Sequence, residues 1–181
     1  GEALTAIDVN TGSFTNTGRV FDAVKLRYQH AAHWTTDLWF AQVVPVDRVK
    51  PDSADHEENF YGWYTSMGHL PRHTIDTFLL VRHDLDNELA GERVGQRGQL
   101  KEYTLGNRVK GSWQALDYGL EWAWQGGSRA HNTIQAWLWH QEAGYTWADV
   151  PGKPRVGMEY NHGSGDDDAS DGRFGTFTAP Y

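Results

Sequence analysis

The sequence contains eight stretches in which large apolar residues alternate with polar ones. The alternation is clearest at residues 24–28, 118–124 and 156–160, where an apolar side chain recurs at every second position. A strand turns successive side chains to opposite faces, whereas a helix would scatter this pattern around its axis. We therefore predict an all-β, antiparallel chain with strands at residues 19–30, 34–45, 58–68, 73–83, 101–111, 116–126, 131–146 and 153–163.

The connections between these segments alternate between short and long. They are short at residues 31–33, 69–72, 112–115 and 151–152, and long at residues 46–57, 84–100 and from 164 onward. Only the connection at residues 127–130 is shorter than this alternation requires. Outer-membrane barrels have short periplasmic turns and longer outer loops, and tilted strands of about ten residues cross a bilayer. The pattern predicts a transmembrane β-barrel in the outer membrane of a Gram-negative bacterium.

Composition is compatible with this interpretation. The 9 Trp, 8 Tyr and 7 Phe lie largely near predicted strand ends, as in the aromatic girdles of a barrel, although an ordinary β-core would also use them. No run approaches the ~18 apolar residues of a membrane helix. The chain has no cysteine, which excludes disulfides and thiolate metal sites. It opens on Gly1-Glu2, so we expect a leader to have been removed or to lie outside this sequence.

The charge is distributed unevenly along the chain. The first two long connections each contain four acids and two bases, and the last contains four acids and one base. All but one unit of the net charge of -8 therefore lies in the long connections. The remaining wall is nearly neutral and can carry an anion, whereas we expect no nucleic-acid partner.

The face opposite the apolar one is polar and carries both signs of charge. Its bases are Lys25, Arg27, Arg82, Arg108, Lys110 and Arg155, and its acids are Asp76, Glu102, Asp117, Glu121 and Glu159. These charges either pair across adjacent strands and stiffen the wall, or form a series of sites for anionic groups inside a lumen. Spacing alone does not separate the two interpretations.

Other chemistries have weaker support. His30 and His33 have no third ligand at a useful spacing for a metal. Asp166, Asp168 and Asp171 resemble a calcium loop but fail the EF-hand spacing, so a surface calcium site and a solvated acidic loop both remain open. No other cofactor is indicated. Nucleophile, phosphate-loop and dinucleotide motifs are absent, so we do not expect an enzyme.

The competing class is a soluble carbohydrate-binding β-sandwich. Its sugar-stacking platform would consist of Trp63, Trp122, Trp124, Trp137 and Trp139. A sandwich hides its apolar faces and has short turns at both ends, whereas a barrel exposes its apolar face to lipid. The alternation of short and long connections favours the barrel.

Several motifs, in order along the chain, resemble the alginate export family of outer-membrane proteins. They are residues 17–28, 103–111, 116–121, 144–146, 153–157, 163–166 and 171–177, which together cover most of the chain. The resemblance implies a monomeric barrel of about eighteen strands whose positive lumen passes an acidic polysaccharide to the cell surface. It implies that Lys25, Arg27, Arg108 and Arg155 are lumen-lining bases and that Asp117 and Glu121 are their acidic partners.

The expected partners follow from this resemblance. They are membrane lipid, lipopolysaccharide, an anionic polysaccharide or smaller anionic solutes, and periplasmic export proteins. A barrel of about eighteen strands needs more than twice this length, so we expect residues 1–181 to be one barrel segment of a longer chain. A closed eight-stranded barrel is the alternative, but side chains would fill it and no polymer would pass.

Overall fold

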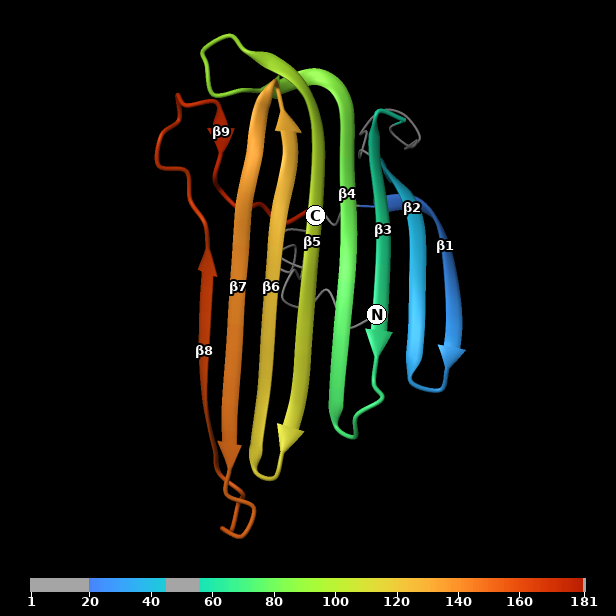
Figure 1. Cartoon of the computed structure of the whole chain (residues 1–181), viewed down its shortest axis with the longest axis vertical. Coiled ribbons are helices and arrows are strands. Elements are labelled where there is room, and N and C mark those ends of the chain that lie inside the picture. Colours follow the sequence, from blue (N-terminus) through green and yellow to red (C-terminus); the bar gives the residue numbers. More distant parts are fainter. Residues whose placement is uncertain (1–19, 45–55, 181) are drawn as a thin grey trace.

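The described residues, 20–44 and 56–180, form one antiparallel sheet in a computed structural model of the chain (Figure 1). Its eight long strands lie side by side in sequence order, and a short ninth strand pairs in parallel with β7. No helix in the described part is long and apolar enough to cross a membrane. The strands are β1 (Val20–Ala31), β2 (Trp34–Val44), β3 (Glu58–Met67), β4 (His73–Ala90), β5 (Arg97–Trp113), β6 (Leu116–Arg129), β7 (Asn132–Thr146), β8 (Arg155–Gly163) and β9 (Arg173–Phe174).

All eight predicted strands are present, but several of their bounds differ from the prediction. β6 continues to Arg129, through most of the connection predicted at residues 127–130, and residues 147–154 join β7 to β8 in place of the short turn predicted at residues 151–152. The predicted long connection at residues 84–100 is mostly strand, because β4 continues to Ala90 and β5 begins at Arg97. The pairing register between β4 and β5 shifts between Asp84 and Leu89. Apolar and polar residues do not alternate in this part of the hairpin, so the sequence pattern did not predict that the strands extend here. Most of the predicted long connection at residues 46–57 lies outside the described residues.

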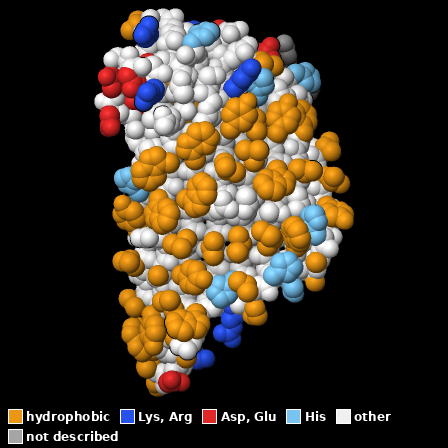
Figure 2. Space-filling view, viewed as in Figure 1, with side chains coloured by type: hydrophobic (Ala, Val, Ile, Leu, Met, Phe, Trp, Pro, Cys, Tyr) orange, Lys and Arg blue, Asp and Glu red, His pale blue; other side chains and the backbone are white. Residues whose placement is uncertain are grey.

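The register places most of the large apolar side chains of the eight long strands on one face. Leu26 lies opposite Leu38, and the same row continues across the neighbouring strands through Trp63, Leu79, Leu105, Trp124 and Trp137. Each member of this row is exposed. Figure 2 shows apolar side chains covering the middle and lower parts of this face, with charged side chains gathered mainly at its upper end. We call it the outward face.

Aromatic residues border the apolar band of the outward face. On β5 the band runs from Tyr103 to Trp113, which is about 33 Å along the strand and about 25 Å if the strand is tilted by about 40°. Above the band, Lys101 lies opposite Ser128 and the face becomes polar. This height and these borders match the apolar band of a membrane barrel.

Asn107 is a polar residue within this apolar band. Its side-chain oxygen accepts a hydrogen bond from the Thr77 hydroxyl at 2.7 Å. The two residues are direct partners on β4 and β5, so the Asn107 side-chain oxygen and the Thr77 hydroxyl proton satisfy each other without solvent. The register therefore explains why an amide is tolerated at this position.

The inward face has a small apolar core that depends on glycine. Phe78 and Leu80 are buried there with Ala41, Phe60 and Ala123. The Phe78 ring lies over Gly106, its partner on β5, where a Cβ atom would overlap the ring. Trp39 covers Gly62 on β3 in the same way. Glycine at these two positions lets large aromatic rings lie flat against the wall.

The sixth connection, predicted to be unusually short, is a tight turn. β6 and β7 join through Ala130 and His131, whose φ values are 46° and 71°. Two positive φ values at the centre of a two-residue hairpin are typical of a type I′ turn. Ala130 is fully buried, so this turn is fixed despite lacking glycine.

The described residues form a single sheet, which does not support the two-sheet sandwich considered above. β1 and β8 are the two edges of this sheet, and within the described residues they do not pair with each other. The eight-stranded closed barrel is therefore not observed. The edges present unpaired backbone groups, which lipid does not tolerate.

Candidate functional site on the inward face

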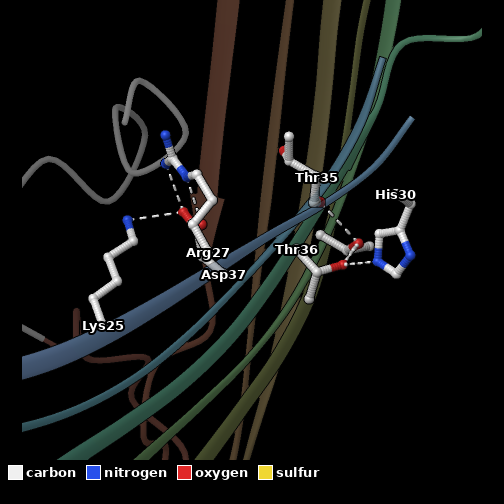
Figure 3. A network of polar contacts seen from close by, with 7 residues as sticks. Lys25, Arg27, His30, Thr35, Thr36 and Asp37 are labelled. Carbon is white, nitrogen blue, oxygen red and sulfur yellow. Dashed lines mark hydrogen bonds and ion pairs between the residues drawn. The ribbon is translucent and has the colours of Figure 1, made fainter. Parts of the chain in front are cut away.

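One acid on β2 holds two bases of β1 (Figure 3). Arg27 contacts Asp37 through two hydrogen bonds of 2.7 and 2.8 Å, and the Lys25 Nζ atom lies 2.8 Å from the same carboxylate. The side chain of Asp37 is 11% exposed, whereas those of Lys25 and Arg27 are 48% and 58% exposed. Two cations share one anion, so these three side chains together carry a net charge of +1 at an accessible position.

A third base lies between two acids near the middle of the sheet. Arg108 on β5 is directly opposite Asp76 on β4 and Glu121 on β6. The Arg108 Nε atom is 3.9 Å from Glu121 Oε2, and all three side chains are buried. A buried guanidinium between two carboxylates is held in place by the wall itself. This arrangement gives rigidity and, unlike the Lys25 and Arg27 pair, leaves no excess of positive charge.

The third pairing spans three strands. Arg155 on β8 donates to Asp117 on β6 at 2.6 and 3.1 Å, forming a bidentate ion pair. The intervening strand carries Gly144, and the guanidinium occupies the space that a Cβ atom would take there. At the upper end, Arg82 donates to Glu58 at 3.2 Å. The cross-strand pairing that the sequence left open is therefore present for these bases.

A groove of about 530 Å³ lies on the inward face over β5 to β8. Lys110 lines it and makes no ion pair with any described residue. His140 and Glu159 line the same groove, with His140 Nδ1 at 2.5 Å from the Asn161 side-chain oxygen and 3.9 Å from Glu159. Glu142 adds a further carboxylate. Arg108 also lines the groove, which is thus polar and has two acids and two bases beside His140.

The segment after β8 folds back onto the inward face. Gln125, which is 0% exposed, donates to the Thr178 carbonyl at 2.5 Å and accepts from the Thr178 backbone N–H at 3.0 Å. The Thr178 hydroxyl donates to Glu102 at 3.1 Å, and Phe177 packs against the apolar core. β9 adds pairing with Thr133 and Ile134 on β7. The predicted long connection from residue 164 is therefore held against the wall.

The folded segment and the wall enclose a second cavity of about 450 Å³. Arg82, Glu102 and Arg129 line it from the wall, and Asp166 and Thr176 line it from the folded segment. Two bases and two acids thus face this space. The segment therefore covers part of the inward face.

The acidic residues of the segment mainly bind their own backbone. Asp166 accepts from the Asp168 and Gly175 N–H groups, Asp168 from Ser170, and Asp171 from Arg173. Such contacts are typical of aspartates in tight turns. Among the described residues, no three potential ligands come together around a metal position. Calcium binding by Asp166, Asp168 and Asp171 stays an untested prediction.

All eleven charged residues predicted for the polar face lie on the inward face, as their register requires. Their role in binding a substrate stays a prediction. Sequence reasoning did not single out Asp37, the acid that holds Lys25 and Arg27. The alternation placed Asp37 on the same face, and only the register between β1 and β2 shows that it lies opposite Arg27. Gln125 had no signal at all, because its partner is remote in sequence.

Comparison with known protein families gives a match over nearly the whole chain. The sequence model of the family described as alginate export matches residues 3–181. No curated protein matches the chain.

Proposed function

This chain belongs to the alginate export family, and from that premise we propose that its sheet is part of the wall of an outer-membrane channel in a Gram-negative bacterium. The channel passes a polysaccharide, which we propose to be anionic, from the periplasm to the cell surface. The inward face lines the lumen, and the outward face meets lipid. In this proposal, strands outside this chain complete the barrel, and no enzymatic activity is involved.

The observation that carries this proposal is the distribution of apolar and charged side chains between the two faces. Val24, Leu26 and Met158 are 75%, 63% and 70% exposed on the outward face, whereas the charged groups of Arg108 and Glu121 are buried on the inward one. A water-soluble sheet would bury its apolar face, since transfer of apolar surface from water is favourable by about 25 cal/mol per Å². Lipid is the solvent in which this arrangement is stable.

The lengths of the connections support an orientation. The turns between β1 and β2, β3 and β4, and β5 and β6 are short and lie at one end of the sheet, together with the longer connection at residues 147–154 (Figure 1). At the opposite end the connections after β2 and β4 are longer, and the β6–β7 turn is the exception. Short turns face the periplasm in outer-membrane barrels, so the opposite end faces the cell surface and lipopolysaccharide. The polymer would enter from periplasmic export proteins at the short-turn end.

The Lys25 and Arg27 pair supports an anionic substrate. Both side chains are half exposed, and their shared Asp37 neutralises only one of them. An Arg guanidinium matches a carboxylate in a bidentate manner, as its contact with Asp37 already does. We propose that this pair contacts the carboxylates of the polymer, whereas Arg108 and Arg155 chiefly hold their wall acids.

Bilayer recordings on the intact protein test this proposal. Replacing Lys25 and Arg27 by glutamine should lower the selectivity for anions over cations and weaken block by an acidic oligosaccharide. Arg93→Gln is the matched control, because Arg93 is exposed in the connection between β4 and β5. Unchanged selectivity in the double variant would refute the lumen role of this pair. A protein that stays in the soluble fraction and migrates identically before and after heating would refute the channel itself.

A further inference from the structure

We propose that the outward face of β1 to β3 binds the headgroup of a phospholipid at its short-turn end. The site is a group of five residues that we call the outward polar cluster: Tyr28, His30, Trp34, Thr36 and Thr65. The inference rests on the proposed function, because it requires this face to meet a membrane. It goes beyond that function, because a lipid-facing wall needs only apolar side chains.

The hydrogen bonds of the cluster run in one direction. The Thr65 hydroxyl donates to the Thr35 carbonyl at 3.1 Å and therefore accepts from Thr36 at 2.7 Å and from Trp34 Nε1 at 3.2 Å. The Thr36 hydroxyl proton is donated to Thr65, so the Thr36 oxygen accepts a hydrogen bond from His30 Nε2 at 3.0 Å (Figure 3). Because Nε2 is the donor to Thr36, the proton of a neutral His30 ring lies on Nε2. The Nδ1 atom of His30 is left as an acceptor on the exposed side chain.

Aromatic rings hold His30 in place. It stacks on Trp34 with ring centres 4.4 Å apart and meets Tyr28 edge-on at 4.6 Å. Trp34 in turn contacts His69 edge-on at 6.1 Å. Tryptophan and tyrosine sit at the level of lipid headgroups in membrane proteins. The cluster therefore lies where a headgroup would be, close to the turn between β1 and β2.

The neighbouring turns supply charge complementary to a phosphate. Residues 31–33 and 68–72 contain His33, His69 and Arg72 but no carboxylate. Together these residues provide nitrogen donors for phosphate oxygens. The His30 Nδ1 atom can accept a hydrogen bond from a headgroup hydroxyl. An anionic headgroup that carries hydroxyl groups, such as phosphatidylglycerol, fits both requirements.

Other polar residues of the outward face offer a comparison. Thr77 and Asn107 bond to each other and lie farther from the short-turn end of their strands. His162, on β8, is exposed on the outward face and packs between Trp137 and Tyr160 with ring centres 4.9 and 6.3 Å away. It has the aromatic packing of His30 without a threonine partner among the described residues. His162 therefore provides a control for the loss of an outward imidazole.

The test uses the full-length protein in phosphatidylcholine vesicles that contain a minor share of phosphatidylglycerol. Native mass spectrometry then counts the lipids retained on release. His30→Phe keeps an aromatic ring against Trp34 and removes both nitrogens, and Thr36→Val with Thr65→Val keeps the shape and removes the hydroxyls. Each variant should retain about ten-fold less phosphatidylglycerol relative to phosphatidylcholine, as expected for one or two lost hydrogen bonds. His162→Phe should match the wild type.

Three results would overturn the lipid site. Wild-type retention in the His30→Phe protein would do so, as would an equal loss in His162→Phe. A dimer that dissociates in His30→Phe would assign the cluster to a second copy of the chain instead. If a cluster variant conducts ions and retains phosphatidylglycerol as the wild type does, the lipid site is refuted and the proposed channel is not. A wild-type protein that never enters the vesicles overturns the channel as well.

Discussion

The contact between Gln125 and Thr178 gives the most specific test of how the segment after β8 is held. Gln125→Leu keeps a side chain of similar size but removes both hydrogen bonds to the Thr178 backbone and a third to the Thr104 hydroxyl at 3.1 Å. Each lost bond costs about 1 kcal/mol, and buried groups left without a partner add to this cost. We expect the folded position of residues 164–180 to lose about 2 to 4 kcal/mol. The population of the released segment would then rise about 30- to 1,000-fold.

Hydrogen exchange measures this change directly. The N–H groups of Thr178 and Phe177, which bond to Gln125 and to Ser164, should exchange faster by that factor, whereas those at the centres of β5 and β6 should not change. Conductance should rise at the same time, because the segment covers part of the face that we propose to line the lumen. Gln135→Leu is the control, since Gln135 is an exposed outward residue on β7. Unchanged exchange at Thr178 in Gln125→Leu would show that the segment is held by other contacts.

Further substitutions test the wall itself. Gly106→Ala should destabilise the protein by about 1 to 3 kcal/mol in urea titrations, because the new Cβ atom would overlap the buried Phe78 ring; equal stability would show that the ring can move. Arg108→Met should cost about 3 to 5 kcal/mol, since it leaves Asp76 and Glu121 buried without their cation, and partial recovery in a double variant with Glu121→Leu, in which only Asp76 lacks a cation, is the check. His131→Gly should stabilise the turn by up to about 1 kcal/mol, because glycine adopts the φ of 71° without strain, and a lower stability would contradict the turn assignment.

Local alternation was enough to predict the strands and their two faces. The period of two is a property of the strand backbone, so Leu26, Trp124 and Met158 could be assigned to one face without any knowledge of their neighbours. The same rule placed Lys25 and Arg108 on the opposite face. The alternation stops where β4 and β5 continue above the apolar band, so no local pattern predicted strand there. The extension depends on pairing between the two strands rather than on burial.

Pairing between distant residues required the tertiary structure. The register decides that Asp37 meets Arg27, that Thr77 satisfies Asn107, and that Arg108 lies between two acids. If the register between two strands shifted by one residue, each of these contacts would be replaced by another. The sequence of a single strand does not specify this register. The position of the segment after β8 is the extreme case, because Gln125 and Thr178 are 53 residues apart. The sequence by itself therefore determined which residues form the wall and which side they face, since strand geometry repeats locally. Only the tertiary structure decided which charges neutralise each other and where the final segment lies, since those contacts join parts of the chain that no local pattern connects.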